Sequence, residues 1–169
     1  MKKVIIGATG SIGSSLARKL VESGEQVHLV GREETSLSEL AGELDSTFTT
    51  CDVLEENFSE KIINDLKNEQ VNGLAYCVGS IDLKPLKLTK KSDFMQSFNL
   101  NLVSATEAIK SLADNLKTNK GSIVLFSTVA VKQGFPNHAI VSSAKGAIEG
   151  LTLALAAEYA PNIRVNCIA

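Results

Sequence analysis

Lys145 and His138 are the side chains of the stretch NHAIVSSAKG, residues 137–146, that could exchange a proton with a bound molecule. Apolar residues recur at spacings of three and four from Ile140 to Leu155, which predicts a helix. Seven residues make two helical turns, so both side chains are expected on one face. An imidazole can donate a proton near neutral pH, and a lysine can donate one directly or through a water. Alternatively, His138 caps the helix or lies at the surface. Val141, four residues before Lys145, has no proton to give.

Three glycines at a spacing of three, Gly7, Gly10 and Gly13, separate an apolar run from a helical pattern. Glycine lets a pyrophosphate approach the main chain, and the helix expected near Ser11 offers free N–H groups and a positive dipole end. A purely structural turn is the alternative. The order strand, loop, helix favours a dinucleotide site. The residues expected to bind the cofactor here are Gly7, Thr9, Gly10, Ser11, Ile12 and Gly13.

Two later positions bear on the identity of the dinucleotide. Folds that select NAD usually place an acidic residue at the end of the second strand, where this chain has Gly31 followed by Arg32. A guanidinium suits a 2′-phosphate, so the sequence predicts NADP rather than NAD, with a solvated arginine as the alternative. Asp52 and Val53 close the third predicted strand. The Asp52 carboxylate can accept from an adenine amino group or cap the next helix.

Strand-like and helix-like segments alternate along the chain. Strands are expected at 3–7, 26–31, 46–53, 73–79, 121–128 and 163–169, and helices at 14–23, 36–44, 57–69, 93–116 and 141–159. Several strands are apolar almost throughout, as expected for parallel strands covered on both faces. The pattern predicts an α/β fold, a three-layer doubly wound parallel sheet of the Rossmann type, in a single domain over 1–169.

Composition narrows the class of partner. The chain has 169 residues, 44% of them hydrophobic and 21% charged, with a net charge of -2. The absence of a basic cluster argues against nucleic acid, and no apolar run is expected to approach the roughly 18–20 residues that span a bilayer. Cys51, Cys77 and Cys167 lack metal-ligand spacing and follow apolar runs, so we expect buried, reduced thiols, no metal site and a cytoplasmic protein.

On these motifs the chain resembles a short-chain dehydrogenase/reductase over essentially its whole length. The resemblance rests on the glycine loop, CDV at 51–53, FNLNLVSA at 98–105, GSIVLFSTVA at 121–130 and the long match from 144 to 169. It implies hydride transfer between NAD(P) and a small-molecule substrate, and a homodimer or homotetramer built through the last long helices. Members usually continue for several tens of residues, so the C-terminal part is expected to be missing.

The resemblance also suggests residue roles. Lys145 would contact the nicotinamide ribose and assist a tyrosine, Asn101 would help to hold a proton-relay water, and Thr128 occupies the position of the serine that holds the substrate oxygen. After the fourth strand the family has the sequence NNAG, and this chain has YCVG at 76–79. Only Gly79 matches. Val141 stands where the family has its tyrosine. Ser127, next to Thr128, is expected to point to the opposite face of its strand.

Three interpretations of Val141 stay open. Another acid, His138 or Lys145, replaces the tyrosine; or the protein is a slow reductase of activated substrates; or it binds NAD(P) without catalysis, in sensing or scaffolding. We favour an NADP-dependent oxidoreductase with altered acid chemistry that acts on a small carbonyl, imine or enone. Small residues on the last helix, Ala144, Ala147, Gly150, Ala154 and Ala157, would let another helix approach.

Overall fold

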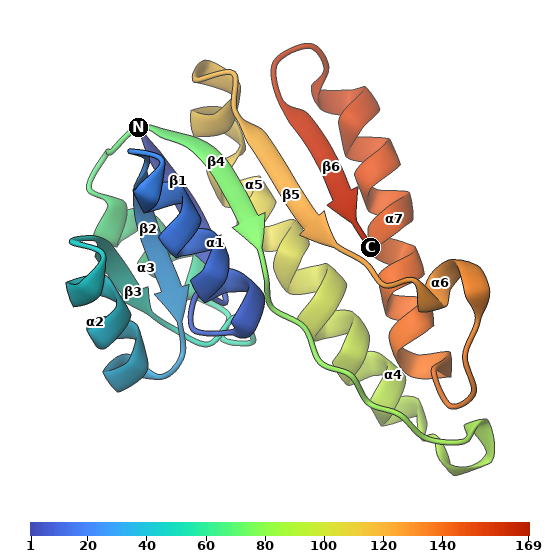
Figure 1. Ribbon diagram of the computed structural model, residues 1–169. Coiled ribbons are helices and arrows are strands. Elements are labelled where there is room, and N and C mark those ends of the chain that lie inside the picture. The colour runs from blue at the N-terminus through green and yellow to red at the C-terminus, as the bar shows by residue number, and fades with distance from the viewer.

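Six parallel strands form one sheet in the computed structural model, which describes residues 1–169 (Figure 1). The spatial order is β3-β2-β1-β4-β5-β6. The strands are β1 (Lys2–Ile6), β2 (Gln26–Gly31), β3 (Thr47–Thr50), β4 (Val71–Tyr76), β5 (Ser122–Phe126) and β6 (Arg164–Ile168). The chain runs outward from β1 to β3 and then returns to place β4 on the other side of β1. This reversal creates a crevice at the carboxyl ends of β1 and β4.

Helices cover both faces of the sheet. They are α1 (Ser11–Glu22), α2 (Glu34–Glu43), α3 (Phe58–Leu66), α4 (Lys91–Phe98), α5 (Ser104–Thr118), α6 (Ala130–Gln133) and α7 (Ala139–Tyr159). A short 3-10 turn, η1 (Leu86–Leu88), precedes α4, and a π-helical segment, η2 (Asn99–Val103), joins α4 to α5. The predicted three-layer, doubly wound parallel sheet is therefore confirmed.

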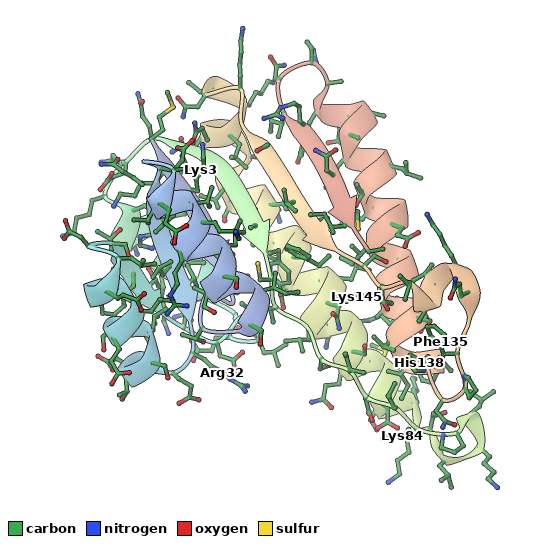
Figure 2. All side chains as sticks on the ribbon, viewed as in Figure 1. Lys3, Arg32, Lys84, Phe135, His138 and Lys145 are labelled. Carbon is green, nitrogen blue, oxygen red and sulfur yellow. The ribbon has the colours of Figure 1, made fainter.

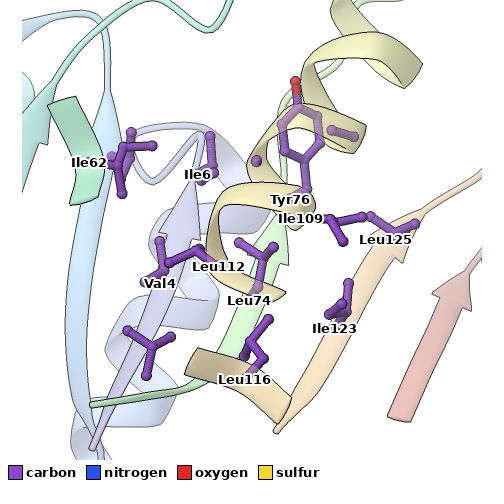
Figure 3. Packing of buried hydrophobic residues seen from close by; sticks show 14 of the residues in the cluster. Val4, Ile6, Ile62, Leu74, Tyr76, Ile109, Leu112, Leu116, Ile123 and Leu125 are labelled. Atoms are coloured by element: carbon purple, nitrogen blue, oxygen red, sulfur yellow. The ribbon is translucent and has the colours of Figure 1, made fainter. Parts of the chain in front are cut away.

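Alternation along the strands divides the core between the two faces. On β1, Val4 and Ile6 belong to a cluster of 21 buried residues under α3, α5 and α7, whereas Ile5 belongs to a smaller cluster under α1 and α2. Figure 3 shows the larger cluster, in which Leu112 and Leu116 of α5 pack over β1, β4 and β5. Burial of these apolar side chains fixes the strand ends that form the site.

The long helix expected at 93–116 is confirmed, because residues 91–118 are helical throughout. Its middle turn differs from an ideal α-helix: the π-helical segment η2, which contains Asn101, lies between α4 and α5. Tyr76 Oη donates to the carbonyl of Leu100 at 2.7 Å, and Ser104 Oγ donates to the carbonyl of Val53 at 2.8 Å. These two hydrogen bonds connect the π-helical segment and the first residue of α5 to the segments that follow β3 and end β4. Local helix propensity does not predict such long-range contacts.

Helix α7 requires a correction to the expectation that no segment is long and apolar enough to span a bilayer. Over Ala139–Tyr159 an 18-residue window reaches a mean hydropathy of 1.3, although Lys145 and Glu149 interrupt it. The value reflects many alanines rather than a bulky apolar run, and α7 packs on β5 and β6 as a crossover helix. Length and composition alone are weak evidence for a span.

Candidate active site

The predicted dinucleotide loop lies in the crevice between the ends of β1 and β4. A groove of about 400 Å³ opens there. Its lining includes seven of the residues predicted to bind the cofactor: Gly7, Thr9, Gly10, Arg32, Asp52, Val53 and Gly79. The groove thus brings together residues that lie far apart in the chain.

The loop geometry fits a diphosphate. Gly7 has a φ of +83°, and a Cβ at Gly13 would lie 2.2 Å from the Gly7 carbonyl oxygen, so both positions need glycine. Helix α1 begins after Gly10 with no side-chain cap and no acidic residue in its first turn. Its first N–H groups are thus available to an anion at the positive end of the helix dipole.

Arg32 lies at the end of β2, at the edge of the groove (Figure 2). Its side chain is 74% exposed, and its nearest acidic partner is Glu33, with Nε and Oε1 4.0 Å apart. The guanidinium is consequently free to take a phosphate. Asp52 Oδ1 accepts from the N–H of Leu54 at 2.9 Å, which stabilises a turn. Asp52 does not cap α3, whose N-cap is Asn57, because the turn at 52–55 intervenes.

A second cavity, the reaction pocket, has a volume of about 270 Å³ and adjoins the groove. Cys77, Val78, Gly79 and Ser80 line both cavities. The reaction pocket has twelve lining residues, from the first turn of α1, the ends of β4 and β5 and the start of α7: Ile12, Cys77, Val78, Gly79, Ser80, Ile81, Phe126, Ser127, Thr128, His138, Val141 and Lys145. Thr128, His138, Val141 and Lys145 are thus brought together around one space.

Asn101 lies behind the pocket wall. It is 1% exposed, and its Nδ2 donates to the carbonyl of Ser97 at 2.9 Å, whereas Oδ1 has no hydrogen-bond partner. A Cβ at Gly79 would lie 3.0 Å from Asn101 Oδ1 and 3.2 Å from Lys145 Nζ. The amide oxygen and the amine therefore flank the same point, and glycine there lets both approach.

Lys145 is held in an environment that disfavours its charge. Burial lowers the pKa of its amine, opposed by weaker interactions with Cys167 and Cys77, and no carboxylate contributes. Burial also raises the pKa of the Cys77 thiol to about 12, so this sulfur in the wall of both cavities is a neutral thiol. All three cysteines are free; Cys51 is buried and the other two are half-buried, less than predicted.

Ser127 and Thr128 both line the reaction pocket. Strand β5 ends at Phe126, so strict alternation stops before these two residues. Ser127 Oγ donates to Glu149 Oε1 at 2.6 Å, and Thr128 Oγ1 accepts from the N–H of Ala130 at 3.3 Å. The two hydroxyls thus have different partners and different remaining hydrogen-bonding capacity.

His138 lies at the N-cap of α7, beside Phe135 and below Lys145 in Figure 2. Its Nδ1 is 2.7 Å from the carbonyl oxygen of Pro136, and its ring centroid is 5.4 Å from that of Phe135. A carbonyl only accepts, so Nδ1 carries the hydrogen and Nε2 is the nitrogen left for other partners. His138 is therefore both a helix-start residue, as one interpretation had it, and a lining residue of the pocket.

Some predicted residues take other places. Ile12 lines the reaction pocket instead of the groove, Ser11 lines neither cavity, and Gly13 is buried beneath the loop. Cys77, Ile81 and Phe126 also line the pocket and were not predicted as site residues. A usable signal existed, because residues that directly follow parallel strands meet at one edge of the sheet.

Comparison with known proteins agrees with this arrangement. A family model described as enoyl-(acyl carrier protein) reductase matches residues 7–169. L-fucose dehydrogenase of Oryctolagus cuniculus is 31% identical, over 98% of this chain and 60% of its own length. A tropinone reductase homolog of Arabidopsis thaliana is 33% identical, over 99% of this chain and 68% of its own length. The crystal structure of the KRED1-Pglu enzyme superposes with a TM-score of 0.95 at 19% identity, covering 99% and 72% of the two chains, a likeness of fold alone.

The chain belongs to the short-chain dehydrogenase/reductase family, an oxidoreductase family whose members bind NAD(P). It spans about 60 to 70% of the length of these curated relatives.

Proposed function

We propose that this protein is an NADP-dependent oxidoreductase that transfers hydride to or from a small carbonyl, imine or enone, with an acid chemistry that does not use a tyrosine. One observation carries the proposal: the groove with the glycine loop and Arg32 shares a wall with the pocket that contains Thr128 and Lys145. A dinucleotide whose phosphates lie on the loop can therefore reach the pocket past Gly79. When bound, its nicotinamide would supply the hydride.

In this proposal Arg32 binds the 2′-phosphate as an exposed, permanently charged partner. The α1 N-terminus and the main chain at Gly7 and Gly10 bind the diphosphate. Lys145 contacts the nicotinamide ribose from the pocket side. Asp52 has one carboxylate oxygen in its turn with Leu54, which leaves the other able to accept from the adenine amino group.

Thr128 holds the substrate oxygen. Its Oγ1 already accepts from the N–H of Ala130, and its hydrogen has no acceptor in the protein, so it can donate to a carbonyl oxygen in the pocket. Val141 is 3% exposed and lines the pocket beside it. The valine keeps this wall apolar, and it cannot transfer a proton.

His138 is the proposed proton donor. The Pro136 carbonyl fixes the hydrogen on Nδ1, so a second proton taken up on Nε2 is the one that can leave toward substrate. Lys145 is the second candidate donor, because burial lowers the pKa of its amine and so makes it a stronger acid than a solvated lysine. Positioned proton transfer typically contributes about 10²- to 10⁴-fold in rate, so either group would matter.

Oxidation of NADPH tests this function, followed by loss of the reduced nicotinamide absorbance with a panel of ketones, imines and enones. Turnover that falls at least about 100-fold in Lys145→Ala, but not in Lys132→Ala, is the expected result. Lys132 is a suitable control because it is exposed on α6 and outside the pocket. Tight NADPH binding without turnover of any substrate would instead support the alternative, a non-catalytic NAD(P)-binding protein.

We also propose that the protein is cytoplasmic and self-associates through α7. Gly150, Leu153, Ala154 and Ala157 are exposed, and Leu153 is 75% exposed, which supports an apolar helix–helix contact. Ala144, by contrast, is fully buried and does not belong to this face. Analytical ultracentrifugation of the unaltered protein and of Leu153→Lys tests this contact. If α7 forms it, the variant should sediment with a larger fraction of monomer.

A further inference from the structure

Glu149 follows Lys145 by four residues on α7, so the two side chains lie on one face of the helix. This spacing places their Cβ atoms about 5–6 Å apart, and oppositely charged side chains at this spacing commonly pair. Here no carboxylate acts on the Lys145 amine. Glu149 Oε1 accepts instead from the Ser127 hydroxyl at 2.6 Å. The carboxylate is thus engaged elsewhere than at its nearest cation along the helix.

Ser127 is itself fixed just after the end of β5. Its N–H donates to the carbonyl of Ile168 on β6 at 2.7 Å, while its hydroxyl donates to Glu149. A hydrogen bond to an ionised acceptor is about twice as strong as a neutral one. The serine therefore holds the Glu149 carboxylate at the end of β5.

The amine of Lys145 is left without an anionic partner. Cys77 at the end of β4 and Cys167 on β6 are the titratable groups that act on it from the sheet, and burial raises the pKa of both thiols. From η2, the amide oxygen of Asn101 flanks the same point as the amine. His138 lies two turns earlier on α7, and no aspartate or glutamate lines the reaction pocket.

We propose that Ser127 is a positioning residue, which holds the Glu149 carboxylate away from Lys145 and so keeps the amine without a counter-ion. When the serine hydroxyl is removed, rotation about the side-chain bonds of Glu149 can bring its carboxylate to Lys145. A carboxylate there stabilises the charged amine and makes it a weaker acid. The use of this amine in hydride transfer rests on the proposed function, whereas its titration can be measured without any turnover.

Trace labelling with acetic anhydride over a range of pH measures this titration, because only the neutral form of a lysine amine reacts. Peptide mass spectrometry of the cofactor-free protein reads the label at Lys145 and at Lys132, which is exposed on α6. In Ser127→Ala, the pH at which Lys145 reacts at half its maximal rate should rise by roughly 0.5–1 unit. Labelling of Lys132 should be the same in all variants.

Two further variants separate the charge of Glu149 from packing. The double variant with Ser127→Ala and Glu149→Gln should return the Lys145 labelling curve to that of the unaltered protein, because the amide brings no charge to the amine. Ser127→Thr keeps a hydroxyl and should leave the curve in place. An unshifted curve in Ser127→Ala overturns the proposal, and so does a shift that persists in the double variant, since that shift would come from altered packing alone.

Turnover distinguishes this inference from the proposed function. Where both hold, kcat/KM with NADPH should fall roughly 3- to 10-fold in Ser127→Ala and recover in the double variant. A shifted labelling curve without NADPH oxidation for any substrate would retain the role of Ser127 and reject the oxidoreductase. Turnover with an unshifted curve would retain the oxidoreductase and reject Ser127 as a positioning residue.

Discussion

The side-chain oxygen of Asn101 and the amine of Lys145 flank Gly79, 3.0 and 3.2 Å from the position that a Cβ at residue 79 would occupy. Gly79→Ala should therefore displace both groups by a few tenths of an ångström. We expect about a tenfold loss of kcat/KM and weaker NADPH binding, because positioning in an active site is sensitive to small shifts. The free energy of unfolding should change by less than about 1 kcal/mol, which urea denaturation measures.

Gly42→Ala is the matched control. Position 42 lies on the exposed face of α2, and a Cβ there would meet no atom within 4 Å. Alanine inside a helix is about 0.5–1 kcal/mol more favourable than glycine, so this variant should be slightly more stable with unchanged kinetics. Unaltered kinetics in Gly79→Ala would show that the approach of Asn101 and Lys145 does not matter for turnover.

Val141→Tyr should increase ketone reduction. The new phenol would stand one helical turn before Lys145, in the wall of the pocket, and would add a proton donor worth about 10²- to 10⁴-fold in rate. Steady-state kinetics with NADPH and a simple ketone measure the gain. The increase should disappear in the double variant that also carries Lys145→Ala.

Val141→Phe separates the hydroxyl from the ring. Phenylalanine fills nearly the same volume and cannot donate a proton, so it should give no gain. An equal gain with phenylalanine would attribute the effect to packing. Retained NADPH affinity with no gain from tyrosine would show that the pocket differs from a tyrosine-dependent one by more than the phenol.

The parts of the site that lie at strand ends could be predicted from the sequence, whereas the parts that depend on distant contacts could not. Gly7, Arg32 and Asp52 follow apolar strands, and parallel strands bring such residues to one edge, so the groove was predictable. The π-helical turn at Asn101 was not, because it depends on Tyr76, which is 24 residues distant from its acceptor Leu100.

Arg32→Gln should weaken NADPH binding and leave NADH binding unchanged. The side chain is 74% exposed, so solvent screening limits the expected loss to roughly 5- to 30-fold, about 1–2 kcal/mol. Calorimetric titration with both reduced cofactors measures it, and the NADPH affinity of the unaltered protein should fall with added salt. Arg164→Gln, an exposed arginine on β6, is the control. Equal or tighter binding of NADH by the unaltered protein would refute the preference for NADP.

A buried histidine should make stability depend on pH. Burial, and secondarily the charge of Lys2, lower the pKa of His28 to about 4. Its Nδ1 and Nε2 lie 2.8 and 2.9 Å from the hydroxyls of Thr47 and Thr49, and Thr49 donates to Asp65. Thr49 must therefore accept from Nε2–H, which leaves Nδ1 as an acceptor in the neutral ring.

Because the pKa is lower in the folded state, unfolding takes up a proton in the acidic range. The contribution of neutral His28 is complete above about pH 6.5, the ordinary histidine value, and is lost as pH falls toward about 4, by up to about 3 kcal/mol. Urea denaturation across this range should show a shallower decline in His28→Gln, which keeps hydrogen-bonding capacity without titrating. Identical slopes in His28→Gln and the unaltered protein would contradict this assignment.

Hydride transfer itself is tested most directly with NADPH deuterated at its transferable position. The protein is incubated with representative ketone, imine and enone substrates, and the products are analysed by mass spectrometry. The proposed function predicts one deuterium in the product of at least one substrate class, and loss of that label when Lys145 is replaced by alanine. Saturable NADPH binding with no deuterium in any product would contradict it.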